Sequence, residues 1–213
     1  DRAFVLALGD SIIGLNAQSD VLERMQRCFV DRRAAAVIAF EKVLPDQVSQ
    51  YGIAKPKSDE DLFEIEAILE KPSVSEAPSH LAVAARYIFR PTIFQAIQST
   101  APDKTGEIQL TEAIGRLIQN GEKVYGLRLR DTEQRYDIGN FQSYFRAFVE
   151  FALADEKLGA SLRAYLETRL DAPMSLWTLF RSTTAFSSTV RTKNCSFLSF
   201  TKRFFVWPPG IAS

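Results

Sequence analysis

Strand-like runs and helix-like periods of hydrophobic residues alternate along this chain from the start to about residue 170. Apolar runs of strand length occupy residues 3–8, 34–43, 51–54, 65–69, 82–89 and 124–129. Apolar residues recur every three or four positions in 20–33, 91–98, 111–120 and in the segment that follows Asn140. The first pattern is typical of buried strands and the second of amphipathic helices. Their alternation predicts an α/β sheet flanked by helices.

The predicted helices carry signals at their ends. Asp20 and Glu23 suit the N-terminal cap of the first helix, and Asn140 suits that of the last. Gly121 follows the third helix and suits a C′ position, where glycine adopts a positive φ. The last helix carries an aromatic stripe that could form a binding surface, but its helical spacing favours a packed core. The stripe comprises Phe141, Tyr144, Phe145, Phe148, Val149 and Ala152.

Composition excludes several classes of protein. The 213 residues include 26 basic and 26 acidic side chains, so no bulk charge favours binding to nucleic acid or to a membrane surface. The two cysteines make no disulfide framework, which indicates a reducing, cytoplasmic location. Cys28 falls on the apolar face of the first predicted helix, which favours a core residue over a nucleophile. His80 is the single histidine, which argues against a zinc site.

The segment 173–213 differs from the rest of the chain. It contains no acidic residue, carries both tryptophans and shows no sustained helical or strand period. A basic and aromatic segment could contact a membrane or a nucleic acid. The abrupt loss of carboxylates and of periodicity favours the other interpretation, a tail that is not part of the evolved protein. We therefore predict one domain over residues 1–172 and an unassigned tail over residues 173–213.

Two aspartates are candidate metal ligands. Asp10 follows the strand-like run 3–8, and Asp137 lies downstream of the run 124–129. Carboxylates at the carboxyl ends of strands lie where an open α/β sheet binds its ligand, and two of them can hold Mg²⁺ against a phosphate. Taken singly, each aspartate is better explained as a turn former or a helix cap. Together, with the acid–base pair Glu70-Lys71 between them in the sequence, they favour a metal and phosphate site.

These residues belong to a longer series of motifs. In chain order the motifs are Leu8-Gly9-Asp10, Val48 to Ile53, Leu69-Glu70-Lys71-Pro72, Ala77-Pro78-Ser79, Arg86-Tyr87-Ile88, Gly106 to Ile114 and Tyr136-Asp137-Ile138-Gly139. The series resembles the sugar-phosphate nucleotidyltransferase family, and within it the bacterial UTP–glucose-1-phosphate uridylyltransferases, from about residue 4 to about residue 170. The block from Gly106 to Thr111, combined with the last motif at this distance, is the most specific part of the resemblance.

The resemblance implies a fold, a reaction and a set of site residues. The fold is a Rossmann-like nucleotidyltransferase sheet, and the reaction transfers a uridylyl group from UTP to glucose 1-phosphate, giving UDP-glucose and pyrophosphate. Asp10 and Asp137 are the implied ligands of Mg²⁺, which is the implied cofactor. Lys71 is implied as the catalytic cation beside the sugar phosphate, Glu70 as the acceptor of sugar hydroxyls, and Gly52 as a glycine that lets the sugar approach the backbone. The resemblance also implies a homo-oligomer.

The chain departs from the family in two places. Ser11 stands where many relatives have a second aspartate, and the Gly-x-Gly-Thr-Arg loop that grips the triphosphate in the family does not occur. We therefore expect an N-terminally truncated, partial domain that lacks the first strand and this loop, and that makes no UDP-glucose on its own. Glu107 and Gln109 are expected to shape a loop beside the sugar, without a direct role.

Two other functions stay open. A related thymidylyl- or guanylyltransferase acting on another sugar 1-phosphate would share these motifs. A non-catalytic regulatory subunit that binds a sugar phosphate would keep the sugar pocket, but the retention of Asp10, Lys71 and Asp137 together argues against it.

Overall fold

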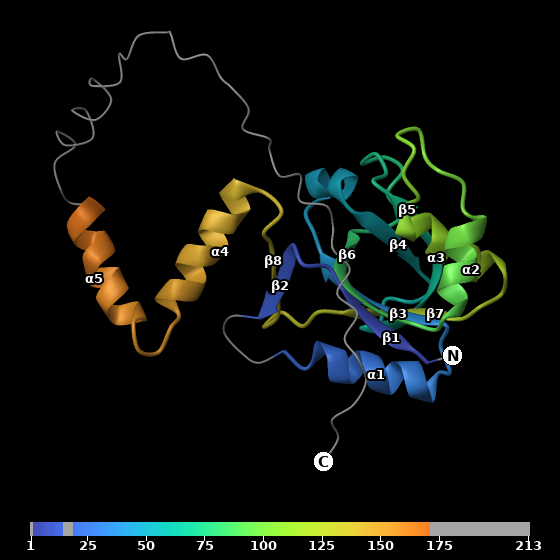
Figure 1. Cartoon of the computed structure of the whole chain (residues 1–213), viewed down its shortest axis with the longest axis horizontal. Coiled ribbons are helices and arrows are strands. Elements are labelled where there is room, and N and C mark those ends of the chain that lie inside the picture. Colours follow the sequence, from blue (N-terminus) through green and yellow to red (C-terminus); the bar gives the residue numbers. More distant parts are fainter. Residues whose placement is uncertain (1, 15–18, 171–213) are drawn as a thin grey trace, which may run out of the picture. The chain divides into compact units, whose positions relative to one another are not determined.

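The computed structural model describes residues 2–14 and 19–170. The segment 173–213 lies outside the described residues, so its interpretation as a tail stays a prediction. The described chain forms two compact units, one that ends at Tyr144 and one that begins at Phe145, and each is described by itself. Figure 1 shows the course of the chain and the labels of its elements.

A six-stranded mixed sheet forms the centre of the first unit. β3 and β7 pair in parallel, and the other neighbouring strands pair antiparallel. The sheet curls far enough for β4 to pair with β6 as well, at Ile53 and Ala82. The predicted α/β sheet is thereby confirmed. In spatial order, the strands are β1 (Phe4–Ala7), β6 (Leu81–Phe89), β3 (Ala36–Lys42), β7 (Val124–Arg128), β5 (Leu62–Glu70) and β4 (Gly52–Pro56) (Figure 1).

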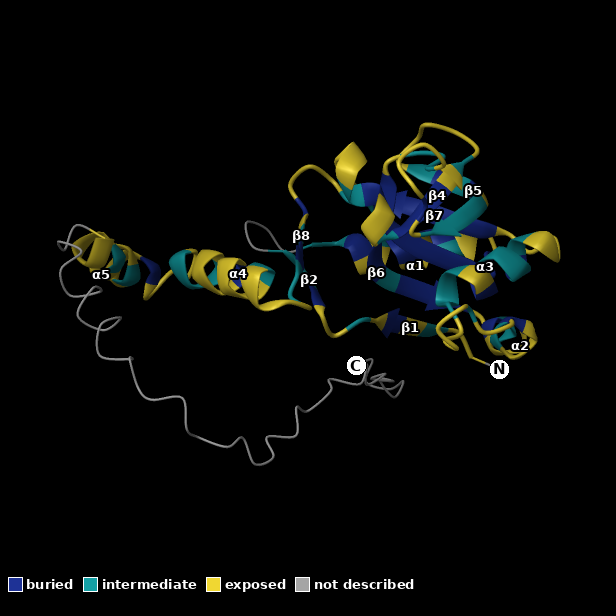
Figure 2. Ribbon diagram, turned by 90° about the horizontal axis from the view of Figure 1, so that it is seen from above, coloured by how far each residue is buried: buried dark blue, intermediate teal, exposed yellow. Residues whose placement is uncertain are grey.

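Helices cover both faces of this sheet. Side chains of β3 alternate between the faces, with Ile38 on one and Val37 on the other. The face of Ile38 packs against α2 (Thr92–Ser99) and α3 (Leu110–Gln119), whereas the face of Val37 packs against α1 (Val21–Asp31). Figure 2 shows the buried residues concentrated in the strands between these helices. The core therefore lies on both sides of the sheet.

A short 3₁₀ helix, η1 (Pro45–Gln50), connects β3 to β4. Its residue Val48 is fully buried against Ile53 of β4 and Ala82 of β6. This small cluster holds the start of β4 in place, which matters because Gly52 is the first residue of that strand.

A second, two-stranded sheet joins the strand that follows β1 to the last strand of the chain's described part. It pairs β2 (Ser11–Gly14) antiparallel with β8 (Gln134–Asp137). The apolar pattern predicts neither strand, because each has only four residues and β8 is mostly polar. The apolar run 124–129 forms β7, which ends at Arg128. Asp137 therefore does not follow β7 directly, and it is the last residue of β8.

The predicted helix ends are confirmed in part. Asn140 accepts a backbone amide in the first turn of α4 through its side chain, and Gly121 has a φ of +81° after α3. Asp20 occupies the N-cap position of α1 as predicted, but its side chain does not cap the helix. The hydroxyl of Ser19 accepts the first free amide of α1 at 3.2 Å, while the carboxylate of Asp20 makes no cap hydrogen bond and pairs with Arg24 instead.

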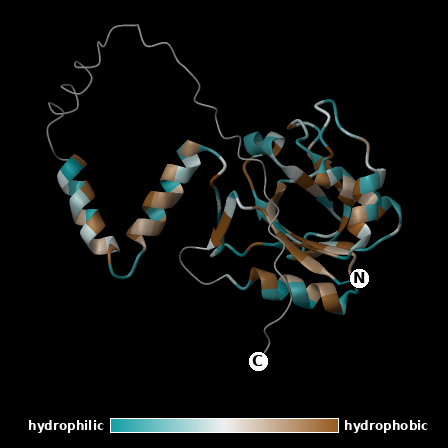
Figure 3. Ribbon diagram, in the orientation of Figure 1, coloured by the Kyte–Doolittle hydropathy of each residue, from teal (hydrophilic) through white to brown (hydrophobic). Residues whose placement is uncertain are grey.

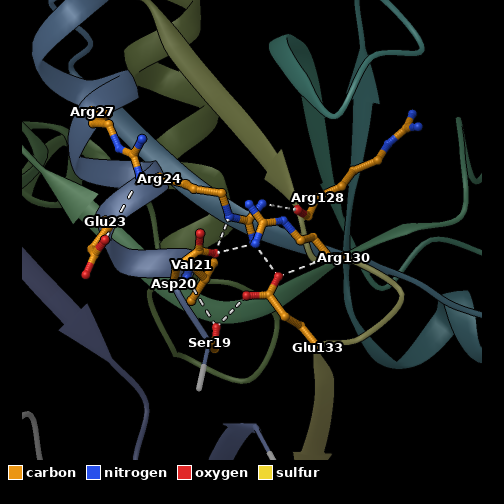
Figure 4. A network of polar contacts seen from close by, with 9 residues as sticks. All are labelled: Ser19, Asp20, Val21, Glu23, Arg24, Arg27, Arg128, Arg130 and Glu133. Atoms are coloured by element: carbon orange, nitrogen blue, oxygen red, sulfur yellow. Dashed lines mark hydrogen bonds and ion pairs between the residues drawn. The ribbon is translucent and has the colours of Figure 1, made fainter. Parts of the chain in front are cut away.

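A network of polar side chains joins the start of α1 to the chain that leads into β8 (Figure 4). Arg24 forms ion pairs with Asp20 at 2.8 Å and with Glu133, and its Nη1 donates to the carbonyl of Arg128 at 3.2 Å. Glu133 is buried and also accepts the hydroxyl of Ser19 at 2.6 Å. These contacts fasten the residues before β8 to α1.

Cys28 packs in the core between α1 and the sheet, as expected. Burial raises the pKa of the Cys28 thiol to about 11. The thiol is therefore protonated at neutral pH, which agrees with a core residue rather than a nucleophile.

Two helices, α4 (Phe141–Leu153) and α5 (Gly159–Leu170), end the described chain. The expectation that the aromatic stripe of α4 packs in a core is wrong, because Phe145 and Phe148 are 60% and 61% exposed. Figure 3 shows hydrophobic residues on α4, but the buried residue of this helix is Ala147. Helical spacing identifies an apolar face without specifying what covers it. Among the described residues, no helix has the length and the apolar character that crossing a membrane requires.

Candidate functional site

The two candidate metal ligands lie side by side because β2 pairs with β8. Asp10 precedes β2, Asp137 ends β8, and Ser11 is the direct partner of Asp137. The amide of Ile138 donates to the carbonyl of Asp10 at 2.8 Å, which extends the pairing by one residue. A methyl group added at Gly139 would lie 3.2 Å from Asp137 Oδ1 and 3.7 Å from Asp10 Oδ2. Both carboxylates therefore approach the same glycine.

The carboxylate pair fits a hard cation that takes few protein ligands. Asp10 is exposed and the side chain of Asp137 is 39% exposed, so both can meet a ligand that arrives from solvent. Within residues 2–14 and 19–170, no cluster of three or more His, Cys, Asp or Glu side chains could hold a metal by itself. Mg²⁺ is commonly held by one or two carboxylates, with water and phosphate oxygens completing its shell. The donor set therefore suits Mg²⁺ together with a phosphate.

Two arginines lie behind this pair. Arg135 places Nη1 3.8 Å from Asp137 Oδ2 and pairs through Nε with Glu41 of β3. Arg86 of β6 donates from Nη2 to the carbonyl of Ser11 at 2.9 Å. Burial lowers the pKa of the Arg86 guanidinium, and so does the nearby charge of Arg135. Sequence reasoning gives neither arginine a role, because Glu41 and Ser11 lie on strands that are distant from them in the sequence.

The other candidate residues gather where β4 and β5 pair. Gly52 begins β4 and is the direct partner of Glu70, which ends β5. Glu70 Oε2 accepts the hydroxyl of Thr111, in the first turn of α3, at 2.6 Å. A methyl group added at Gly52 would lie 3.1 Å from Thr111 Oγ1 and 3.3 Å from both Glu70 Oε2 and Val83 Cγ2. Gly52 thus lies directly against a carboxylate and a hydroxyl, and the site leaves no room for a larger residue.

The residues before α3 shape this side of the site. Asp103 Oδ1 accepts the amide of Glu107 at 3.1 Å, and its Oδ2 accepts the side-chain amide of Gln109 at 2.7 Å. These contacts place Glu107 and Gln109 in the loop that leads into α3, and the expectation that this loop lies beside the sugar stays a prediction. Sequence reasoning missed Thr111, because its contact with Glu70 joins a helix to a distant strand.

Lys71 lies in the turn that follows β5. Its amide donates to the carbonyl of Tyr51 at 3.0 Å, and its φ is +45°, a conformation that costs energy in a residue other than glycine. Its side chain is exposed, so its charge can meet a ligand from solvent. The turn thus holds the backbone of Lys71 against the residue before Gly52.

Arg135 links the two groups of candidate residues, since its Nη1 lies 3.8 Å from Asp137 Oδ2 and its guanidinium carbon lies 4.8 Å from the ring centre of Tyr51, the residue before Gly52. Burial raises the pKa of the Tyr87 phenol, and the charges of Glu70 and Asp10 raise it further. The structure brings the candidate residues together as two groups in one region of the first unit.

Similarity to known proteins identifies the family. The sequence profile of the nucleotidyl transferase family matches residues 2–153. The chain belongs to this family. It is 32% identical to the UTP–glucose-1-phosphate uridylyltransferase of Streptococcus pneumoniae over 169 residues, which cover 78% of this chain and 56% of the relative. It is 36% identical to the Pseudomonas aeruginosa protein of the same name over 149 residues, which cover 69% of this chain and 52% of the relative.

Solved structures agree with this assignment. A UTP-bound UGPase from Acinetobacter baumannii matches with a TM-score of 0.68 at 29% identity, covering 80% of this chain and 56% of that chain. A UDP-glucose pyrophosphorylase complexed with UDP-glucose matches with a TM-score of 0.62 at 31% identity, covering 68% of this chain and 54% of that chain. The resemblance and the nucleotidyltransferase fold expected from the sequence are confirmed. The chain spans about half the length of the curated relatives it matches.

Proposed function

We propose that the protein transfers a uridylyl group from UTP to glucose 1-phosphate, giving UDP-glucose and pyrophosphate. The observation that carries this proposal is the approach of Asp10 and Asp137 to Gly139, with Arg135 linking this pair to Tyr51, the residue before Gly52. The first group offers oxygen ligands for a cation, and the second offers polar partners for a sugar. The names of the similar proteins support the uridylyl donor and the glucose acceptor.

Asp10 and Asp137 are the proposed ligands of Mg²⁺. The bound ion would supply positive charge where two anionic substrates approach one another. Asp137 Oδ1 accepts the amide of Gly139 at 2.9 Å, so one oxygen of this carboxylate is held before any ligand arrives. A ligand set that is oriented in advance loses little free energy to reorganisation when it is used.

Gly52, Glu70 and Lys71 are the proposed partners of glucose 1-phosphate. The hydroxyl of Thr111 holds Glu70 Oε2 at 2.6 Å, which keeps the carboxylate beside Gly52. At this position, Glu70 would accept hydrogen bonds from sugar hydroxyls. Lys71, exposed in the next turn, would act as the catalytic cation by placing its charge on the sugar phosphate.

Calorimetric titration of glucose 1-phosphate into the chain, with Mg²⁺ present, tests the sugar pocket. A hydrogen bond to a charged group contributes about 1.5–3 kcal/mol, so Glu70→Gln should weaken binding about tenfold or more. Lys71→Ala should weaken it as well, because the phosphate loses its cation. Glu66→Gln is the matched control, since Glu66 lies on the same strand but is exposed and paired with Lys55 at 2.7 Å. Equal affinity in Glu70→Gln, Lys71→Ala and the control would place the pocket elsewhere.

Pyrophosphate release in the whole protein tests the transfer itself. With UTP, glucose 1-phosphate and Mg²⁺, we expect turnover. Asp10→Asn and Asp137→Asn should each raise the activation barrier by several kcal/mol, which lowers the rate about 10³-fold. Faster turnover with dTTP or GTP than with UTP would favour the related thymidylyl- or guanylyltransferase. Binding of glucose 1-phosphate without turnover would favour the non-catalytic subunit.

We also infer a cytoplasmic location, which rests on the absence of a disulfide framework in the sequence, and a homo-oligomeric state, which rests on the family resemblance. Cell fractionation and light scattering of the whole protein test them. A monomer in light scattering would refute the second.

A further inference from the structure

A buried arginine connects the two groups of site residues. The side chain of Arg135, on β8, is only 7% exposed. Its Nη1 lies 3.8 Å from Asp137 Oδ2, and its Nε pairs with Glu41. Its guanidinium carbon lies 4.8 Å from the centre of the Tyr51 ring. The three contacts reach three different elements, which are β8, β3 and the residue that follows η1.

The partners of Arg135 lead directly to proposed site residues. Asp137 is itself a proposed metal ligand. Tyr51 precedes Gly52 in the chain, and its carbonyl accepts the amide of Lys71 at 3.0 Å. One guanidinium therefore contacts the metal side of the site and the residue that anchors the sugar side.

We propose that Arg135 is a positioning residue that holds the carboxylate of Asp137 and the backbone at Tyr51 in one fixed arrangement. This inference rests on the proposed function, because it assigns the metal to Asp137 and the sugar phosphate to Lys71. Arg135 acts through these neighbours and does not itself touch the substrate, since its side chain is buried and its Nε is engaged by Glu41.

The geometry of arginine explains why this residue type suits the position. A planar guanidinium can pair with carboxylates along its edge while its face stacks on an aromatic ring, and an ammonium group cannot do both. Arg135 pairs with Glu41 and Asp137, and its guanidinium carbon lies over the ring of Tyr51. Asp137 is then held at both oxygens, since Oδ1 accepts the amide of Gly139.

Glu41 fixes the arginine in turn. Its side chain is 20% exposed and pairs with Arg135, so each of these poorly exposed charges compensates the other. Removing one partner of such a pair leaves the other charge uncompensated, which is strongly unfavourable. Arg135 therefore cannot turn away from Asp137 without breaking its contact with Glu41.

The chain offers a matched control on α1, in an arginine whose partners include the segment that leads into β8. Arg24 is another poorly exposed arginine, at 14%, and it pairs with Glu133, whose side chain is 4% exposed (Figure 4). Its other contacts go to Asp20 and to the carbonyl of Arg128. A lysine at position 24 should cost stability as a lysine at position 135 does, but it should leave the metal carboxylate in place.

Mn²⁺, a paramagnetic substitute for Mg²⁺, is the probe for the experiment on the 213-residue chain. In the unsubstituted chain, Mn²⁺ should broaden the amide signals of Asp10, Ile138 and Gly139. Arg135→Lys should lower the Mn²⁺ affinity about tenfold or more, the usual effect of removing a residue that orients a metal ligand. It should also weaken binding of glucose 1-phosphate, because the Tyr51–Lys71 contact is released. Arg24→Lys should change neither affinity.

Urea unfolding of each variant shows that the comparison is made on folded protein. If Arg135→Lys does not fold, Glu41→Gln is the second variant, and it should weaken Mn²⁺ binding in the same direction. Equal Mn²⁺ affinities in Arg135→Lys and the unsubstituted chain would overturn the inference about Arg135. Equal losses of Mn²⁺ affinity in Arg135→Lys and Arg24→Lys would do the same. Neither result would affect the proposed metal ligands. Absence of Mn²⁺ broadening near Asp10 in the unsubstituted chain would overturn the metal assignment and the inference with it.

Discussion

Replacing Gly52 with alanine would place one methyl group inside the proposed sugar pocket. The added carbon would lie 3.1 Å from Thr111 Oγ1 and 3.3 Å from both Glu70 Oε2 and Val83 Cγ2. Ordinary contacts between carbon atoms lie at about 3.5–4.0 Å, so the neighbours must move apart. Glu70 and Thr111 are half-buried and can rotate, whereas Val83 is held in β6. The movement therefore falls on the carboxylate and the hydroxyl.

The size of the effect follows from the hydrogen bond that must shift. Glu70 and Thr111 are 2.6 Å apart, and a hydrogen bond to a charged group contributes about 1.5–3 kcal/mol. Overpacking a well-packed site costs about 1–3 kcal/mol, and the freedom of the two side chains favours the lower end for stability. Binding of glucose 1-phosphate should fall about 10- to 100-fold, because 1.4 kcal/mol corresponds to about a tenfold change in affinity.

Calorimetry with glucose 1-phosphate and urea unfolding measure the two effects separately. Gly115→Ala is the control, because no atom lies within 4 Å of the methyl group it would add within α3. Alanine is more favourable than glycine in a helix interior by about 0.5–1 kcal/mol, so this variant should be more stable and bind with unchanged affinity. If Gly52→Ala bound glucose 1-phosphate as tightly as the control, Gly52 would not border the sugar.

Three further predictions concern stability. Gly126→Ala would place a methyl group 2.3 Å from the ring of Phe63 and 3.0 Å from that of Phe40. The free energy of unfolding in urea should therefore fall by about 1–3 kcal/mol, and unchanged stability would contradict this packing. Arg33 is exposed with a φ of +51° after α1, so Arg33→Gly should raise the free energy of unfolding by about 0.5–1 kcal/mol, and a lower melting temperature would count against this reasoning. Burial raises the pKa of Cys28 in the folded chain from 9.0 to about 11. Between these two values the folded chain keeps a proton that the unfolded chain loses. The free energy of unfolding should therefore decline as the pH rises from 9.0 to about 11. Cys28→Ala should show a smaller decline in urea unfolding over the same pH range, and an equal decline would refute the assignment.

Local sequence patterns determine most of the main sheet and its helices. β3 and β6 were predicted correctly because helices or other strands cover both of their faces, so nearly every residue in them is apolar. α1 and α3 were predicted from the spacing of their buried residues, which every amphipathic helix against a sheet must show. The aromatic stripe of α4 has the same spacing, yet most of it is exposed, because a period does not specify what a face meets.

The candidate chemistry was also visible in the sequence, since the motifs name the residue types that bind a cation and a sugar phosphate. Asp10, Glu70, Lys71 and Asp137 could be selected because their short motifs occur together and in one order, although each motif is weak by itself. Thr111 could not be selected as a site residue, because a threonine gains its role only from the carboxylate that its hydroxyl meets.

Only the tertiary structure decided how these residues are grouped. Asp10 meets Asp137 through the pairing of β2 with β8, two strands of four residues that carry no period long enough to predict. A shift of one residue in the register of paired strands turns every side chain to the opposite face, so the closeness of the two carboxylates depends on this register alone. Arg135 meets Glu41 and Tyr51 for the same reason. Its contacts join segments that are distant in sequence, and only the folded chain brings them together.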